Sequence, residues 1–186
     1  MLLLLASMLL SGSATSEGTH AAGEYYAVRS GSSWTYQAGK DKVVIQVSGV
    51  ENWKADMQLS WGKRSTGGTW RIKEGAWLEH LSIRGPGETV LLPALLQVGT
   101  RWTGPASMER NGKDNSQYEV VAIDATAEVP AGTYEKCVAV LETSSAGGNV
   151  LTHFWAPNVG KVGVKSNDDW VLKLTKHEAG RRLNGD

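Results

Sequence analysis

Short runs in which apolar and polar residues alternate restrict the fold of this chain more than any other feature. Met57, Leu59 and Trp61 form one such run, because a polar residue precedes each of them. Successive side chains of a β-strand point to opposite faces, so this pattern predicts a strand with one buried face. Similar runs recur from residue 32 to residue 176, separated by turns rich in Gly, Asn and Asp. The sequence therefore predicts an almost entirely β-stranded protein.

The expected strands are short and closely spaced. They cover residues 32–37, 42–50, 57–61, 68–73, 77–83, 117–125, 134–143, 149–155, 161–165 and 170–176, and another strand begins at Trp102. Leu91 to Val98 comes nearest to a helical pattern, but Pro93 interrupts it and favours a connector. Many short strands at this spacing are typical of an antiparallel open barrel, half-barrel or sandwich. We predict an all-β fold of that class.

A short internal match suggests how the strands are grouped. The segment Gly31 to Thr35 resembles the segment Gly99 to Thr103, because both begin with Gly and end in Trp-Thr. Two related halves, 25–90 and 91–176, would explain this match within a single β domain spanning 24–176. A chance match is the alternative in a chain with 22 Gly and eight Trp. The polar tail, 177–186, is expected to extend into solvent.

The amino terminus is typical of an export signal. Leu2 to Leu10 is an apolar run far shorter than the roughly 20 residues that span a bilayer. Small residues follow it, so we expect a signal peptide over residues 1–14 with cleavage after Ala14, or as late as Ala22. No Lys or Arg precedes the run, so the true translation start is expected upstream of Met1. No Cys follows the run, which favours release to the periplasm or exterior over a lipid anchor. A buried amino-terminal strand or helix is the alternative.

Two turns have the most specific local sequence. In Val129-Pro130-Ala131-Gly132, Pro presets a turn and Gly tolerates unusual dihedral angles, so this segment should join two antiparallel strands. In Ala156-Pro157-Asn158, Pro and Asn occupy the central turn positions.

These turns also support a resemblance. The order Val129 to Tyr134, then Cys137-Val138, then Trp155 to Val162 resembles a pattern in exported bacterial β-rich domains of unknown function. The upstream Leu91 to Pro93 and Val98 to Trp102 extend the resemblance over residues 91–165, about half of the chain. This sequence departs from the pattern at Asn158, where Gly is usual, and at Lys161, where an apolar residue is usual. The resemblance implies an envelope or extracellular location and an open barrel similar to lipoprotein-carrier folds. It implies no reaction.

Charge and cysteine content argue against several classes of protein. Nineteen basic and nineteen acidic residues give no net charge, so no overall field favours nucleic acid or anionic lipid. Cys137 is alone, so it has no intramolecular disulfide partner and is expected to be a small buried hydrophobe. We expect no nucleic-acid partner, no membrane span in the mature chain and no cofactor.

The candidate catalytic or metal-binding residues are scattered. Glu79-His80 and His177-Glu178 are adjacent pairs, and adjacent strand residues face opposite sides of a sheet. Asn167 to Asp169 lacks the ligand spacing of a calcium loop, and no pair of Cys or His residues has zinc-ligand spacing. We therefore assign no catalytic or metal-binding residue. The rival hypothesis is a hydrolase or metal-dependent enzyme that gathers Glu79, His80, His153 and Asp169 from distant strands.

The eight Trp residues allow a binding role. Trp34, Trp61, Trp102 and Trp170 alternate with polar neighbours and are expected in the core. Trp53 and Trp77 lie beside turn residues, so we expect them to be exposed and take them as the candidate ligand-binding residues. We predict a non-enzymatic exported module that binds an apolar ligand, a lipidated protein or an envelope polymer. A structural envelope module that only associates with other proteins is a third hypothesis.

Overall fold

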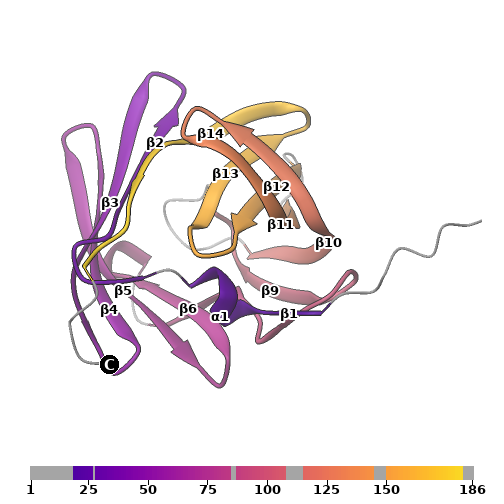
Figure 1. The fold of residues 1–186 in the computed structure, drawn as a ribbon, viewed down its shortest axis with the longest axis horizontal. Helices are drawn as coiled ribbons and strands as arrows, with labels where there is room; N and C mark the ends of the chain where they lie inside the picture. Colours follow the sequence, from indigo (N-terminus) through magenta and orange to yellow (C-terminus); the bar gives the residue numbers. More distant parts are fainter. Residues whose placement is uncertain (1–18, 27, 85–86, 108–114, 145–149, 182–186) are drawn as a thin grey trace, which may run out of the picture.

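A computed structural model describes residues 19–26, 28–84, 87–107, 115–144 and 150–181 of the chain. Its main feature is one antiparallel sheet of twelve strands that curls into a nearly closed barrel (Figure 1). The first six strands are β2 (Ser33–Ala38), β3 (Asp41–Glu51), β4 (Lys54–Trp61), β5 (Arg64–Lys73), β6 (Ala76–Leu81) and β7 (Thr89–Leu92). The other six are β9 (Arg101–Pro105), β10 (Asn115–Val129), β11 (Gly132–Ser144), β12 (Val150–Ala156), β13 (Gly160–Ser166) and β14 (Asp169–Glu178). The predicted all-β antiparallel fold is confirmed, and of the expected open barrel, half-barrel or sandwich the structure shows a nearly closed barrel.

The sheet consists of two six-stranded meanders joined edge to edge. Within β2–β7 and within β9–β14, each strand pairs with the next one along the chain. The meanders meet where β14 pairs with β2, and Leu174 lies opposite Tyr36 there. Among the described residues no ladder joins the outer edges, β7 and β9, so one seam of the barrel stays unsealed. The Trp102 indole of β9 crosses this seam and donates a hydrogen bond to the Val90 carbonyl of β7 at 3.1 Å.

Both sequence-predicted turns connect neighbouring strands. Val129 pairs with Gly132 at the end of the β10–β11 hairpin, which leaves a two-residue loop at Pro130 and Ala131. Ala156 pairs with Gly160 at the end of β12 and β13. Asn158, between them, has a positive φ of 58°, a conformation that Asn adopts more readily than most residues. The two turn predictions are confirmed.

The two matching segments form the same local structure. Gly31 N–H donates to the Val47 carbonyl and Gly99 N–H donates to the Val120 carbonyl, at 3.0 and 2.8 Å. The Arg29 N–H donates to the Ser32 hydroxyl, and in the second segment the Gln97 N–H donates to the Thr100 hydroxyl. Each segment then leads into the first strand of its meander. The sequence match thus corresponds to a repeated hydrogen-bonded turn.

A small substructure packs beside the barrel. It contains β1 (His20–Ala21), the single-turn helix α1 (Ala22–Tyr25) and β8 (Leu95–Leu96), and β1 pairs with β8. The Ala22 and Tyr25 side chains are fully buried. The Glu24 carbonyl accepts a hydrogen bond from the Asn158 N–H at 2.9 Å, so α1 contacts the β12–β13 turn. The segment 91–98, expected as a connector, contains the end of β7 as well as β8. β7 pairs with the preceding strand β6, whereas the partner of β8 is β1, which is distant in sequence.

Candidate functional site

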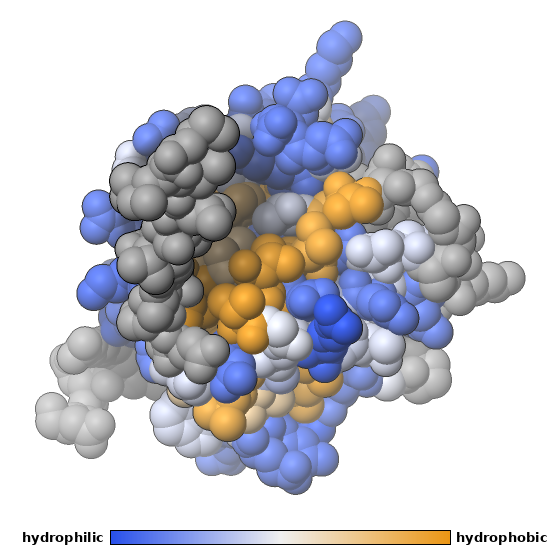
Figure 2. All heavy atoms as spheres, turned by 90° about the vertical axis from the view of Figure 1, so that its right-hand side faces the viewer, coloured by the Kyte–Doolittle hydropathy of each residue, from blue (hydrophilic) through white to orange (hydrophobic). Residues whose placement is uncertain are grey.

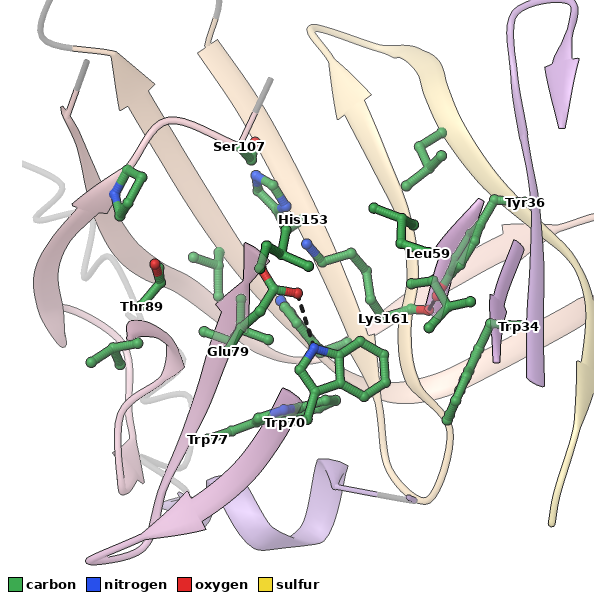
Figure 3. A pocket seen from close by; sticks show the side chains of 18 of the residues that line it. Trp34, Tyr36, Leu59, Trp70, Trp77, Glu79, Thr89, Ser107, His153 and Lys161 are labelled. Carbon is green, nitrogen blue, oxygen red and sulfur yellow. Dashed lines mark hydrogen bonds between the residues drawn. The ribbon is translucent and has the colours of Figure 1, made fainter. Parts of the chain in front are cut away.

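The interior of the barrel contains a cavity of about 250 Å³. It lies between the two meanders and reaches the seam, because Val90 of β7 and Pro105 of β9 are among its lining residues. Most of the lining is apolar. Leu59, Tyr36 and Trp34 lie on one side, whereas Glu79, His153, Ser107 and Thr89 lie on the other (Figure 3). The cavity therefore has an apolar side and a polar side.

Four Trp residues form one wall of this cavity. Trp34, Trp70, Trp77 and Trp155 follow one another edge to face, with ring centroids 5.5, 5.5 and 5.0 Å apart. Aromatic pairs in this geometry stabilise each other beyond their buried area by roughly 0.5–1.5 kcal/mol. The wall draws on both halves of the barrel, since Trp155 belongs to β12 and the other three to β2, β5 and β6. It is a continuous aromatic surface on the apolar side of the lining.

The structure places the two candidate Trp residues in different environments. Trp53 lies in the β3–β4 turn and is 72% exposed, in agreement with the expected exposure, but it does not line the cavity. The expected exposure of Trp77 is wrong, because its side chain is only 2% exposed. Trp77 is the second residue of β6, and its ring packs edge to face against Trp155 of β12 and against Tyr26, with ring centroids 5.0 and 5.1 Å away. Trp77 stays a candidate binding residue because it lines the cavity, and not because it is exposed.

The four Trp residues expected in the core differ in burial. Trp34 is 2% exposed. Trp102 and Trp170 are half-buried and pack against the core, and Trp61 is half-buried near the end of the β4–β5 hairpin. Alternation identified the inward face of each strand, but it did not show which positions lie close to a strand end or a seam. Cys137 is fully buried, as expected.

A buried polar cluster closes the polar side of the cavity. Its centre is the Glu142 carboxylate of β11, which is 2% exposed. The His153 ring of β12 contacts it at 2.7 Å, and the Ser116 hydroxyl donates to it at 2.9 Å. The Ser107 backbone N–H donates to it at 2.8 Å, and the Ser107 hydroxyl donates a second, short hydrogen bond. These donors give a buried carboxylate the partners that it needs.

The charge states of this cluster follow from its contacts. Burial by itself raises the pKa of Glu142, but hydrogen bonds from His153 and Ser107 lower it to about 2. Burial, helped by the nearby Lys161 ammonium, lowers the pKa of His153 to about 4 against the opposing effect of Glu142. At neutral pH the carboxylate is therefore ionised and the imidazole is neutral, with its Nε2–H donated to the carboxylate.

A second carboxylate on the polar side is also paired. Glu79 of β6 accepts a hydrogen bond from the Trp70 indole at 2.9 Å. Its other oxygen lies 3.4 Å from the Arg84 guanidinium of the 3₁₀ turn η1 (Ser82–Arg84). Both side chains line the cavity and are mostly buried. Glu79 thus fixes the orientation of one Trp in the aromatic wall.

Lys161 differs from the other charged residues of the cavity. It lies on β13 opposite Trp155, and its ammonium group lies 4.6 Å from the centre of the Trp155 ring. Its side chain extends toward His153 and Glu79 from between the two sides of the cavity (Figure 3). Burial lowers the pKa of Lys161, while the carboxylates of Glu79 and Glu142 oppose this effect. Among the described residues, no hydrogen bond or ion pair to its ammonium is found.

The four residues of the rival enzyme hypothesis are only partly brought together. Glu79 and His153 line the same cavity. His80 points to the other face of β6 and its Nδ1 lies 2.7 Å from the Gly87 carbonyl, whereas Asp169 is exposed at the start of β14. Within the part of the chain that the structure describes, no three His, Cys, Asp or Glu side chains group in a way that could hold a metal ion.

Sequence reasoning missed Glu142 and Lys161, although both positions had a signal. Val138, Val140 and Glu142 alternate on β11, so Glu142 faces inward with two valines. Lys161 is the charged residue of the otherwise uncharged segment 159–164. A charged residue at an inward-facing strand position predicts a buried polar contact or a ligand contact. Ser107 and Arg84 lie outside the strands and gave no such signal.

The outer surface has hydrophobic side chains that are separate from this cavity. On one face, hydrophobic side chains form a band that adjoins hydrophilic ones (Figure 2). The exposed large hydrophobic residues of the described chain include Leu95, Val98, Val121 and Val150. None of these four lines the cavity.

Comparison with protein-family models, with curated proteins and with solved structures gives no match. No helix in the described ranges has the length and apolar character needed to cross a membrane. The function is therefore inferred from the geometry of the cavity alone.

Proposed function

We propose that the protein is a non-enzymatic binding protein that holds a small apolar ligand inside its barrel. The observation that supports this proposal is the mostly apolar cavity with its wall of four Trp residues. A cavity of 150 Å³ holds one benzene molecule, so 250 Å³ has room for about ten non-hydrogen atoms in proportion. This size supports a small ligand over an envelope polymer or a whole lipidated protein.

The polar cluster supports binding over catalysis. In a Ser-His-acid triad the imidazole lies between the hydroxyl and the carboxylate and removes the hydroxyl proton. Here the Glu142 carboxylate lies between Ser107 and His153, and both donate to it. Ser107 thus has its hydroxyl proton directed at a carboxylate that is already saturated with donors. This arrangement orders the polar side of the cavity and leaves the serine without an imidazole base.

The proposal includes export to the periplasm or exterior. Residues 1–14, the expected signal peptide, lie outside the described residues, and so does the Ala14 cleavage position. The alternative position, Ala22, is fully buried in α1, and its N–H donates to the Ala94 carbonyl at 3.2 Å. Cleavage after Ala22 would remove β1 and break α1, whereas cleavage after Ala14 leaves both intact. The folded structure therefore supports the earlier position.

Binding of 1-octanol, which has nine non-hydrogen atoms, tests the proposed function. Titration calorimetry should show saturable binding to the wild-type protein, and the midpoint of thermal unfolding should rise with octanol concentration. Leu59→Trp places a larger side chain in the cavity, so it should weaken octanol binding at least tenfold. Val121→Trp adds the same side chain at an exposed strand position and should bind like the wild type. A wild-type protein that shows neither heat nor a thermal shift would contradict the proposal.

A further inference from the structure

The charged groups that line or adjoin the cavity are unequally satisfied. Glu142 accepts hydrogen bonds from His153, Ser107 and Ser116, and Glu79 accepts from Trp70 and contacts Arg84. Lys161 has three donor hydrogens, and its ammonium lies over the face of the Trp155 ring, which carries a partial negative charge. The nearby carboxylates influence Lys161 through space, but their oxygens are occupied by other donors. Within the described chain, the Lys161 ammonium is the cavity cation that remains without a paired anion.

We propose that the ligand is a carboxylate with an unbranched apolar chain of about eight carbons, and that its head group pairs with the Lys161 ammonium. This inference rests on the proposed function and names the chemistry of the ligand. The acyl chain would lie toward Leu59 and Tyr36, and the carboxylate would lie toward the polar side. Octanoate, with ten non-hydrogen atoms, fits the size estimated from the cavity volume.

The number of available donors favours a carboxylate head group over a phosphate. A phosphate monoester has nearly two negative charges at neutral pH and is bound by several cations or by a set of backbone N–H groups. The cavity offers one unpaired ammonium, and Arg84 is engaged by Glu79. A carboxylate has a single charge, so one ammonium neutralises it. The three donor hydrogens of Lys161 allow a direct hydrogen bond to that head group.

Burial makes such a pair depend on both partners. An ammonium inside the barrel loses hydration, which lowers the pKa of Lys161 when no anion contacts it. A carboxylate at hydrogen-bond distance favours the charged form and offsets this loss. Removing one partner of a buried pair leaves the other charge uncompensated, and such changes are strongly destabilising. The affinity for the carboxylate should therefore respond to Lys161 much more than the affinity for an uncharged ligand does.

Parallel titrations with octanoate and 1-octanol test the head-group inference. The wild type should bind octanoate more tightly than octanol. Lys161→Met should weaken octanoate binding more than tenfold and change octanol binding less than threefold, and Lys161→Arg should restore most of the octanoate affinity. Lys165→Met is the matched control, because Lys165 lies on the same strand over the Phe154 and Trp170 rings and does not line the cavity. It should bind both ligands like the wild type.

The outcomes separate this inference from the proposed function. Octanol binding with no octanoate preference and no effect of Lys161→Met would overturn the head-group inference and leave the proposed function intact. If neither octanoate nor octanol binds, the head-group inference and the proposed function are both overturned. If Lys161→Met fails to fold, the carboxyl carbon of ¹³C-labelled octanoate gives a second test on the wild type. Its carboxylate should titrate at lower pH when bound than when free, and an unchanged titration would overturn the inference.

Discussion

At the scale of single residues, the interior of this barrel shows how buried charge is tolerated. Glu142 is nearly inaccessible, yet its two oxygens have four hydrogen-bond contacts, from three side chains and one backbone N–H. The neutral form of His153 is part of this arrangement, because it donates to the carboxylate without adding a second buried charge. Stability should therefore depend on pH through these two residues.

The sign of this dependence is the same for both groups. His153 has a folded-state pKa of about 4, below its ordinary value of 6.5, so its stabilising effect is complete above pH 6.5 and is lost as the pH falls toward 4. Glu142, with a pKa of about 2 against 4.5, loses its effect at still lower pH. The free energy of unfolding should therefore decrease as the pH is lowered from 7 to 4.5.

Urea unfolding at pH 7 and at pH 4.5 measures this fall. His153→Gln keeps a side-chain donor but cannot take up a proton, so it should flatten the pH dependence in this window. His177→Gln is the control, because burial also lowers the pKa of His177 outside the Glu142 cluster. An equal flattening by both substitutions would show that the Glu142 cluster is not the main source.

At the scale of elements, close packing between neighbouring strands fixes where side chains are allowed. Gly67 and Gly68 are adjacent on β5, but only Gly68 faces a crowded position. A Cβ built on Gly68 would lie 2.4 Å from the His80 carbonyl oxygen and 2.9 Å from the Met57 Cε, whereas a Cβ on Gly67 would meet nothing within 4 Å. The β5–β6 contact thus requires glycine at one of two neighbouring positions.

Alanine substitution at the two glycines should separate their roles. Gly68→Ala forces the backbone of β6 to move, so it should lower the free energy of unfolding by about 1–3 kcal/mol. Gly67→Ala should change it by less than about 0.5 kcal/mol, as surface substitutions usually do. Chemical denaturation followed by Trp fluorescence measures both. A similar loss for the two variants would mean that the β5–β6 spacing does not depend on Gly68.

At the scale of the whole molecule, the fold keeps its amino-terminal elements only if the proposed signal peptide is cleaved before them. His20 pairs with Leu96, and α1 contacts the β12–β13 turn through Glu24. Amino-terminal sequencing of the exported protein should therefore give a first residue of Thr15. A mature chain that begins at Gly23 would contradict this prediction, and protein recovered only from the cytoplasm would contradict export.

The sequence predicted the strands well because each strand depends on a local alternation of side chains. Met57 and its neighbours on β4 are one example, and the Pro130 turn is another. The cavity was not predictable in the same way, because Trp77, His153 and Lys161 line one cavity only after distant strands pair. Trp77 shows this most directly, since its neighbouring Gly75 and Ala76 suggested exposure and its burial depends on Trp155 and Tyr26.

The pairing of β14 with β2 also determines when the barrel can fold. Gln37 and Lys173 face each other across this ladder, so the first meander lacks one of its neighbours until almost the whole polypeptide has been synthesised. Bringing together segments this distant in sequence is slow compared with forming hairpins. Under the proposed export as an unfolded chain, late closure of the barrel would delay folding until after transit.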